Sequence, residues 1–414
     1  MGNEKIFTAK QFNSYSKDGE DFKKNGETIP SDSENPMTEK QFKQLVATEV
    51  QKFINRSFDN IVVLVGAGAS VVINDSGIDK RYGKTVAMIA QNVYGQLENG
   101  THSFQEEEQT DVFKLEELIE KSQYPNQLEF DDENKLKNFD LEDFLSYIIS
   151  FQKFAISDDK QKLLDTIRAI QKIIVTDVSY DHDKDVFKHI SFLNILSNLT
   201  KSENKLNIVT TNYDTLLEDA AESAKYTVFD GFSFSRIPKF DSDNFDWSLV
   251  KNVSAVKTHE LVYKSNVINL LKIHGSITWE ESKSGKNIIR KNEGNVEHPV
   301  MVFPSSDKYA QSYQRPYFDL FTKFQELLKK PNTLLISTGF SFSDNHISQM
   351  ILSAIKNNES LSALITDFNI DSEDKNENWK ELEKDMDANY SIAFLKATMN
   401  TDLTDFLGGK VNDD

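Results

Sequence analysis

The segment Gly66-Ala67-Gly68-Ala69-Ser70 carries residue types that suit the binding of phosphate. It follows the five apolar residues Ile61–Val65. Glycine has no Cβ, so the backbone there can turn sharply and approach a ligand closely. The N–H groups of such a turn, with the start of the next helix, form a cradle for phosphate or pyrophosphate. Val71 stands at the third glycine of G-x-G-x-x-G, so a plain strand-to-helix turn is an open alternative.

Three other polar segments follow apolar segments in the same way: Thr210–Asp214, His274–Ser276 and Gly339–Asp344. In open α/β sheets, ligands bind at the carboxyl edge of the strands. We therefore expect all four segments to converge on one cleft. His274 ends an apolar segment and precedes Gly-Ser, which favours a catalytic histidine over a hydrogen-bonded structural one.

A parallel sheet is the element that would position these segments. Continuous apolar runs are typical of strands buried on both faces. Five such runs are Ile61–Val65, Leu206–Thr210, Val267–Ile273, Thr333–Ser337 and Leu361–Thr366. The predicted fold class is α/β, with a Rossmann-like, mostly parallel sheet and a helical insertion.

The chain divides into four predicted parts. Residues 1–37 are polar and form an N-terminal arm, and residues 38–99, opening with a helix at Thr38, begin the sheet domain. Residues 100–197 contain apolar residues at helical spacing and are too long for a simple crossover, so they form a helical insertion. Residues 198–414 complete the sheet domain.

The tripeptide Gly83-Lys84-Thr85 invites comparison with a P-loop. That motif requires a glycine five residues earlier, where this chain has Ile78, and it must directly follow a strand. A loop and helix start beside the first glycine turn is the favoured interpretation.

Composition excludes several classes of function. The formal charge is −19, from 47 basic and 66 acidic residues, so we expect no direct binding of nucleic acid. The chain has no cysteine, which excludes disulfides and cysteine-ligated zinc, and we expect no metal. No apolar run approaches the roughly 20 residues of a membrane span, and the polar N-terminus lacks an apolar signal core. These features predict a cytoplasmic protein that does not contact membranes.

Taken together, four segments resemble the sirtuin superfamily in their order and spacing: Gly66–Ser70, Thr210–Asp214, Lys272–Ser276 and Gly339–Ser341. The resemblance covers residues 57–95 and 200–400, and leaves out the arm and the insertion.

The resemblance implies that NAD is the substrate and that the bond between nicotinamide and ribose is cleaved. It implies that Asn212 positions a nucleophile beside the ribose and that His274 acts as a base. Asp214 would touch the ribose, or would only cap the helix that follows. The NAD-binding residues implied by the same resemblance are Gly66, Ala67, Gly68, Ala69, Ser70, Thr211, Asp214, Gly339, Phe340 and Ser341.

One departure from the family narrows the expected activity. Sirtuin deacylases carry a small zinc module with four cysteines, and this chain has none. Sirtuin-like proteins without that module and with a helical insertion include antiphage effectors that hydrolyse NAD. The resemblance therefore implies an oligomeric NAD glycohydrolase of antiphage defence, with a HerA-type hexameric ATPase as a partner. An NAD-dependent deacylase or ADP-ribosyl transferase, and a non-catalytic sensor of NAD or ADP-ribose, are the alternatives.

Overall fold

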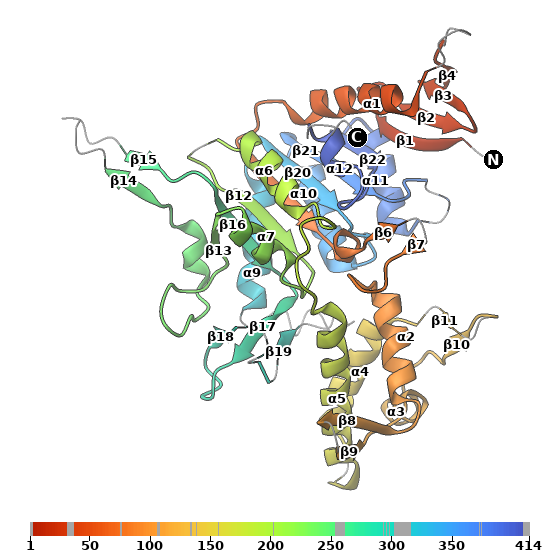
Figure 1. Ribbon diagram of the computed structural model, residues 1–414, viewed down its shortest axis with the longest axis vertical. Coiled ribbons are helices and arrows are strands. Elements are labelled where there is room, and N and C mark those ends of the chain that lie inside the picture. Colours follow the sequence, from red (N-terminus) through yellow and green to blue (C-terminus); the bar gives the residue numbers. More distant parts are fainter. Residues whose placement is uncertain are drawn as a thin grey trace.

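The fold is built on a large central sheet (Figure 1). The computed structural model describes residues 3–30, 37–74, 77–105, 108–132, 135–137, 139–155, 157–201, 203–252, 261–292, 294, 296–297, 299–301, 316–371, 373 and 375–408. Within these residues the sheet has eleven strands in the order β13-β16-β12-β5-β20-β21-β22-β1-β2-β3-β4.

The first seven strands of that order run parallel. They are β13 (Thr227–Phe229), β16 (Val267–Lys272), β12 (Leu206–Thr210), β5 (Asn60–Val65), β20 (Thr333–Thr338), β21 (Leu361–Asp367) and β22 (Ile392–Lys396). All five predicted strands are confirmed. Apart from the edge strand β13, the parallel strands lie side by side in the order 3-2-1-4-5-6 when they are numbered along the chain, which is the strand order of a Rossmann fold. The strand order reverses between β5 and β20, and this switch point is where such folds bind ligands.

Helices cover both faces of the parallel strands. Along β5, Ile61, Val63 and Val65 belong to one apolar core and Val62 and Leu64 to the other, because successive side chains point to opposite faces. The first core is covered by α1 (Glu39–Ile54), α6 (His189–Leu199), α7 (Leu216–Ser223) and α12 (Leu403–Phe406). The second core is covered by α9 (Tyr317–Lys329), α10 (Asn345–Asn357) and α11 (Glu377–Asp387).

The polar N-terminal segment, expected as an arm, extends the sheet instead. Its strands are β1 (Glu4–Ala9), β2 (Tyr15–Asp18), β3 (Asp21–Lys24) and β4 (Glu27–Thr28), all antiparallel. β1 pairs with β22, with Phe7 opposite Leu395 and fully buried. Asn25 and Gly26 both have positive φ between β3 and β4, which is the Asn-Gly signal of a tight hairpin. That dipeptide was the signal that sequence reasoning missed. Residues 31–36 of the predicted arm lie outside the described residues.

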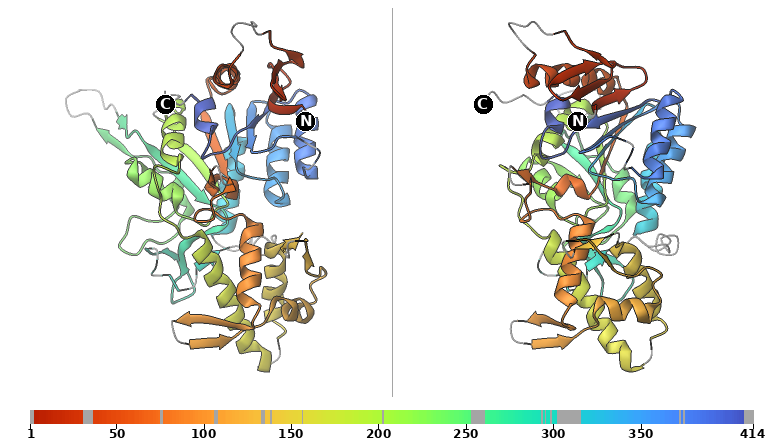
Figure 2. Two further views of the ribbon diagram at one scale, coloured as in Figure 1. Left: turned by 45° about the vertical axis from the view of Figure 1, so that its right-hand side comes forward. Right: turned by 90° about the vertical axis from the view of Figure 1, so that its right-hand side faces the viewer.

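A helical lobe, which we define as residues 86–178, projects from the carboxyl side of the sheet (Figure 2). It has its own apolar core, to which Val93, Phe144 and Ile170 belong. Its elements are α2 (Val86–Leu97), β8 (Thr101–Gln105), β9 (Glu108–Asp111), α3 (Leu115–Ser122), β10 (Glu129–Phe130), β11 (Leu136–Lys137), α4 (Leu141–Gln152) and α5 (Ser157–Val178). The lobe corresponds to the predicted insertion but starts earlier, and α6 packs on the sheet rather than in the lobe.

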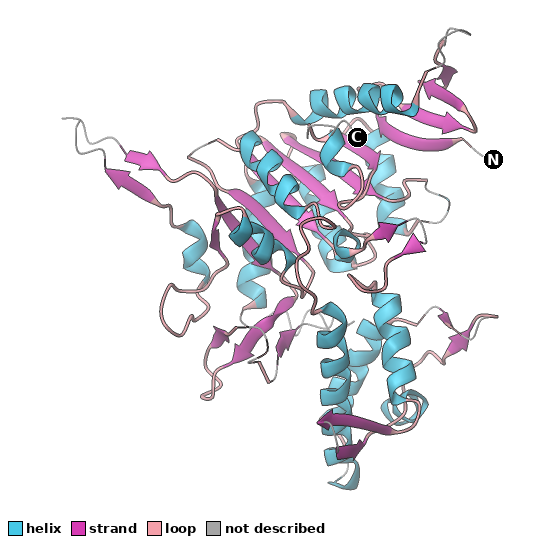
Figure 3. Cartoon of the chain, viewed as in Figure 1, coloured by secondary structure: helices cyan, strands magenta, loops and turns pink. Residues whose placement is uncertain are grey.

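The remaining elements are short and lie around the sheet (Figure 3). They are η1 (Ala67–Ser70), β6 (Ile73–Asn74), β7 (Gly77–Ile78), η2 (Ser242–Asp246), β14 (Val250–Asn252), β15 (Leu261–Tyr263), β17 (Gly275–Glu281), β18 (Ile288–Arg290) and β19 (Pro299–Met301). In the part of the chain that the structure describes, no helix is both long and apolar enough to cross a membrane.

Candidate functional site

The four polar segments begin at the same edge of the sheet. Val65 is the partner of Thr210 on one side and of Thr338 on the other, and Thr210 is the partner of Lys272. Each strand therefore reaches its last residue at the same level. The expected convergence of the segments that follow is confirmed.

The first glycine turn packs backbone against backbone on the turn after β20. The Gly66 N–H donates to the Thr338 carbonyl and the Gly68 N–H to the Gly339 carbonyl, both at 2.9 Å. A Cβ on Gly66 would lie 2.5 Å from the Gly339 oxygen, closer than atoms can approach. Gly339 itself has φ +65°, where a side chain is disfavoured. Glycine is therefore required here for close packing of two loops.

The predicted phosphate cradle is not formed as expected. β5 is followed by the four-residue 3₁₀-helix η1, and the next α-helix, α2, starts at Val86, so no α-helix starts directly behind the glycines. The N–H groups of Gly66, Gly68 and Ala69 already donate to backbone carbonyls. The expectation of an α-helix directly after the turn is wrong, because the described residues 71–74 and 77–85 belong to a connection to the helical lobe instead.

Gly83-Lys84-Thr85 belongs to that connection and is not a P-loop. Gly83 packs so closely on the Ser70 backbone that no Cβ would fit. Lys84 forms an ion pair with Asp177 of α5, and the Thr85 hydroxyl caps α2 by accepting from the Met88 N–H at 3.3 Å. The interpretation as a loop and helix start beside the glycine turn is confirmed.

A cavity of about 890 Å³ lies between the carboxyl edge and the root of the helical lobe. Such a volume suits a ligand of dinucleotide size. The predicted site residues that line it are Ala67, Gly68, Thr211, His274, Gly339, Phe340 and Ser341. The predicted residues that do not line it are Gly66, Ala69, Ser70, Asn212 and Asp214.

His274 lies beside a carboxylate at the cavity. Its Nε2 lies 3.5 Å from Asp344 Oδ2, and both side chains are largely buried. Asp344 also caps α10, since its Oδ1 accepts from the His346 and Ile347 N–H groups at 2.9 and 3.2 Å. From the sequence, Asp344 was expected at the cleft only as the end of the segment Gly339–Asp344. The structure adds its contact with the histidine, which lies 70 residues earlier in the chain.

Asn212 lies beside the cavity-lining residue Thr211 and is 9% exposed. Its side-chain Nδ2 donates to the Gly66 carbonyl at 3.1 Å and to Ser70 Oγ at 3.0 Å. Its Oδ1 has no hydrogen-bond partner among the described residues. A buried amide oxygen without a donor costs about 1–3 kcal/mol, and a ligand hydroxyl would relieve that cost.

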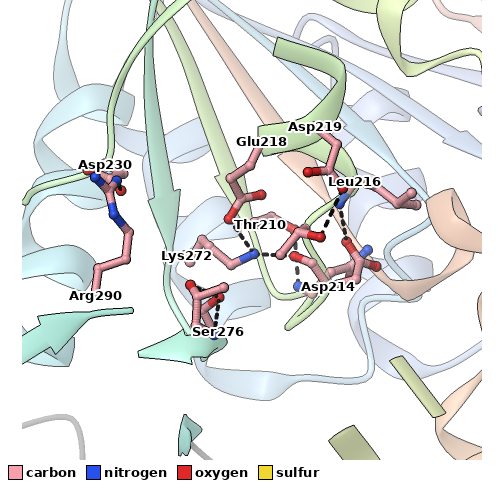
Figure 4. Close-up of polar contacts among 12 residues, drawn as sticks. Thr210, Asp214, Leu216, Glu218, Asp219, Asp230, Lys272, Ser276 and Arg290 are labelled. Carbon is pink, nitrogen blue, oxygen red and sulfur yellow. Dashed lines mark hydrogen bonds and ion pairs between the residues drawn. The ribbon is translucent and has the colours of Figure 1, made fainter. Parts of the chain in front are cut away.

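Asp214 is the centre of a buried polar network behind Asn212. Its Oδ2 accepts from Ser70 Oγ at 2.6 Å and from the Tyr180 hydroxyl at 3.0 Å. Its Oδ1 accepts from the Leu216 N–H at 3.3 Å, at the start of α7 (Figure 4). Asp214 thus accepts a hydrogen bond from the first residue of α7, but the N-cap of that helix is Thr215 and not Asp214, and Asp214 also holds the Ser70 hydroxyl.

Lys272 supports the same loop from the next strand. It is almost fully buried, donates to the Asp214 carbonyl and forms a 2.9 Å ion pair with Glu218 (Figure 4). Burial raises the pKa of Glu218, while Lys272 opposes that shift. The network therefore ties β12, β16 and α7 together directly behind the candidate catalytic residues.

Several cavity residues were missed from the sequence. Asp140 and Asp143 come from the helical lobe, and Phe368 and Thr398 follow β21 and β22. The sequence showed that polar residues follow β21. It did not predict strand β22, and it did not predict that the helical lobe would contribute residues to the cavity. The lining contains carboxylates and two histidines, and among the described residues it contains no lysine or arginine.

No group of three or more histidine, aspartate or glutamate side chains in the described ranges could hold a metal ion.

The fold and the site together define a Rossmann-like protein with a cleft at its topological switch point. Residues 206–392 match the family model described as a SIR2-like domain. That segment contains Asn212, His274 and Gly339–Ser341, but not the first glycine turn. A search of curated protein sequences finds no match.

Solved sirtuin structures are only distantly similar. One described as the structural basis for the mechanism and regulation of Sir2 enzymes is 12% identical with a TM-score of 0.37, and the match covers 88% of this chain and 97% of that one. A Sir2 with a p53 peptide and NAD⁺ is 11% identical with a TM-score of 0.33, covering 86% and 93%. The assignment of the fold therefore rests on the strand order rather than on these likenesses.

Proposed function

We propose that this protein is an NAD glycohydrolase, which cleaves NAD to nicotinamide and ADP-ribose. The observation that carries the proposal is the pairing of Asn212, with its unpartnered Oδ1, and the Asp344-supported His274 at one edge of the sheet. Both lie in the segment that matches the SIR2-like domain, and His274 lines a cavity of suitable size.

In the proposed reaction the bond between ribose C1′ and the nicotinamide nitrogen breaks, and nicotinamide leaves with the electron pair. The ribose becomes oxocarbenium-like, so a nearby amide oxygen and a carboxylate-supported imidazole stabilise the developing charge. Water adds to C1′ and loses one proton, which His274 accepts and passes to solvent. Asp344 stabilises the imidazolium formed in that step, in the same way as the acid of a hydrolytic triad.

The experiment is to follow nicotinamide release from NAD by the purified full chain, with isothermal titration of NAD and ADP-ribose alongside. Release that requires His274 and persists in EDTA supports the proposal. Binding without release supports the sensor alternative. Release that depends on an acylated peptide supports the deacylase, and transfer of labelled ADP-ribose to protein supports the transferase. Complete loss of release in EDTA, restored by zinc, would contradict the metal-free reaction.

We further propose that this activity serves antiphage defence in the cytoplasm by depleting NAD. This rests on the sirtuin resemblance combined with the absence of cysteine. An unrestrained NAD hydrolase would harm its own cell, so we propose control through association, as a homo-oligomer and with a HerA-type hexameric ATPase. Light scattering of the chain, alone and with such an ATPase, tests this part. A strict monomer at micromolar concentration that forms no complex with the ATPase would contradict it.

A further inference from the structure

Tyr180 connects the helical lobe to the candidate reaction centre. It lies two residues after α5 ends, where the chain returns from the lobe to the sheet. Its hydroxyl donates to Asp214 Oδ2 at 3.0 Å, and the same oxygen accepts from Ser70 Oγ at 2.6 Å. Ser70 Oγ in turn accepts from Asn212 Nδ2 at 3.0 Å. A continuous chain of hydrogen bonds therefore runs from the end of the lobe to the side chain of Asn212.

The direction of each bond in this chain is determined by the chemistry of the groups. Asp214 Oδ2 is an acceptor, so both hydroxyls must point their hydrogens at it. With its hydrogen committed, Ser70 Oγ offers only lone pairs to Asn212, which selects the Nδ2 end of the amide. The Gly66 carbonyl accepts from the same Nδ2 at 3.1 Å. Asn212 Oδ1 is thereby left as the free acceptor.

Packing fixes the position of the Tyr180 ring. The ring stacks on Phe187 with centroids 6.0 Å apart and meets Tyr82 edge-on at 6.4 Å. Burial and the neighbouring Asp214 carboxylate raise the pKa of Tyr180 well above its ordinary value, so the hydroxyl keeps its proton at physiological pH. Tyr180 is therefore a permanent donor held in one place.

We propose that Tyr180 is a positioning residue, which acts through Asp214 and Ser70 to hold the Asn212 amide with its oxygen free for substrate. The inference rests on the proposed NAD cleavage and deepens it by linking the helical lobe to the same site. Movement of α5 relative to the sheet would shift the Tyr180 hydroxyl and alter Asn212 without any contact between the lobe and the reacting atoms.

The test compares Tyr180→Phe with Tyr82→Phe in the full chain. Each change removes one hydroxyl from the same aromatic cluster, but the Tyr82 hydroxyl donates to Asp183 at 3.3 Å, away from Asn212. Tyr180→Phe should lower kcat for nicotinamide release about tenfold, with KM changed less than about twofold, because it weakens one hydrogen-bonded constraint on a group acting in the transition state. Tyr82→Phe should leave both constants unchanged.

A double-mutant cycle distinguishes positioning from a general loss of structure. If Tyr180 acts through Ser70, Tyr180→Phe should have less than about a twofold effect on kcat in a Ser70→Ala background, since coupled residues are non-additive. Equal effects in both backgrounds would overturn the proposed route. A wild-type kcat for Tyr180→Phe would overturn the proposal itself.

Crystal structures of wild type and Tyr180→Phe test whether Tyr180 positions the Asn212 side chain, and this test does not depend on turnover. The expected result is displacement or loss of the Ser70–Asn212 hydrogen bond in the variant only. An unchanged Asn212 side chain would overturn the inference even if NAD is cleaved. Absence of nicotinamide release from wild type would instead overturn the proposed function, while the two crystal structures would still test the role of Tyr180.

Discussion

Buried asparagines lie at both ends of the strands β5, β12 and β16, and their surroundings differ between the two ends. At the amino end, Asn60, Asn207 and Asn269 of β5, β12 and β16 form a ladder, in which Asn207 donates to Asn60 at 3.2 Å and Asn269 donates to Asn207 at 2.9 Å. At the carboxyl end, Asn212 donates to the Gly66 backbone and to Ser70. Each group leaves one amide oxygen without a donor among the described residues, on Asn269 and on Asn212.

An unpartnered amide oxygen therefore does not by itself indicate a ligand site. Asn269 lies away from the cavity, and its ladder holds neighbouring strands in register. Asn212 adjoins the cavity-lining Thr211 and lies at the same sheet edge as His274. We therefore expect changes at the amino end to affect stability and changes at the carboxyl end to affect turnover.

The largest expected effect is on turnover at the carboxyl end. Asn212→Ala and His274→Ala should each lower nicotinamide release by roughly 10²-fold or more, the usual scale for a positioned acid–base or electrostatic group. A thermal melt recorded beside each rate should show folded protein. Two folded variants with near wild-type turnover would contradict the catalytic assignment. Folded, inactive variants that still bind NAD would strengthen it.

The second prediction concerns the pH dependence of stability behind the carboxyl end. Burial lowers the pKa of His189 to about 4, with His182 adding to this and Asp214 opposing it. The folded state therefore binds a proton on His189 less tightly than the unfolded state does. The free energy of unfolding keeps its full value above pH 6.5 and decreases as the pH falls towards 4. His189 alone should account for about 3 kcal/mol of that loss.

Urea unfolding at pH 4.5 and pH 7.5, for wild type and His189→Gln, measures the contribution of His189. Glutamine cannot be protonated, so the variant should show a smaller difference between the two pH values. Identical pH dependence of wild type and variant would rule out a neutral buried His189.

The third prediction tests the amino end directly. Asn207→Ala removes the middle of the ladder and leaves Asn60 Oδ1 without the hydrogen bond from Asn207, which should lower the free energy of unfolding by about 1–3 kcal/mol. Turnover per folded molecule should be unchanged. A large fall in kcat at unchanged stability would remove the distinction between the two ends.

The smallest expected effect on turnover concerns Asp344, the carboxylate beside His274 in the cavity. Asp344→Asn keeps a side chain that can cap α10 but removes the charge next to His274. We expect kcat to fall about tenfold, the equivalent of roughly 1.4 kcal/mol, with little change in melting temperature. An equal loss in stability and activity would show that Asp344 serves only the helix.

Local sequence information was enough to predict five of the seven parallel strands and the polar edge. Ile61–Val65 and Leu361–Thr366 are continuous apolar runs, and burial on both faces follows from composition alone. Parallel strands share an edge, so the segments after them had to meet there. The mismatch of Gly83-Lys84-Thr85 with a P-loop was also evident from local spacing.

Contacts between residues that are far apart in the chain could not be predicted from local sequence patterns. The pairing of Phe7 with Leu395 depends on an edge strand that the sequence pattern did not reveal. The early start of the helical lobe and the packing of α6 on the sheet depend on which apolar faces meet, and several arrangements satisfy the same helical spacing.

By itself, therefore, the sequence determined which segments are buried strands and that Asn212 and His274 follow two of them. Only the tertiary structure decided that Asp344 supports His274 and that Asp214, Ser70 and Tyr180 orient Asn212. The physical reason is that burial of a strand follows from its own residues. The rotamer of a side chain at a strand end depends instead on hydrogen-bond partners that other loops bring to it.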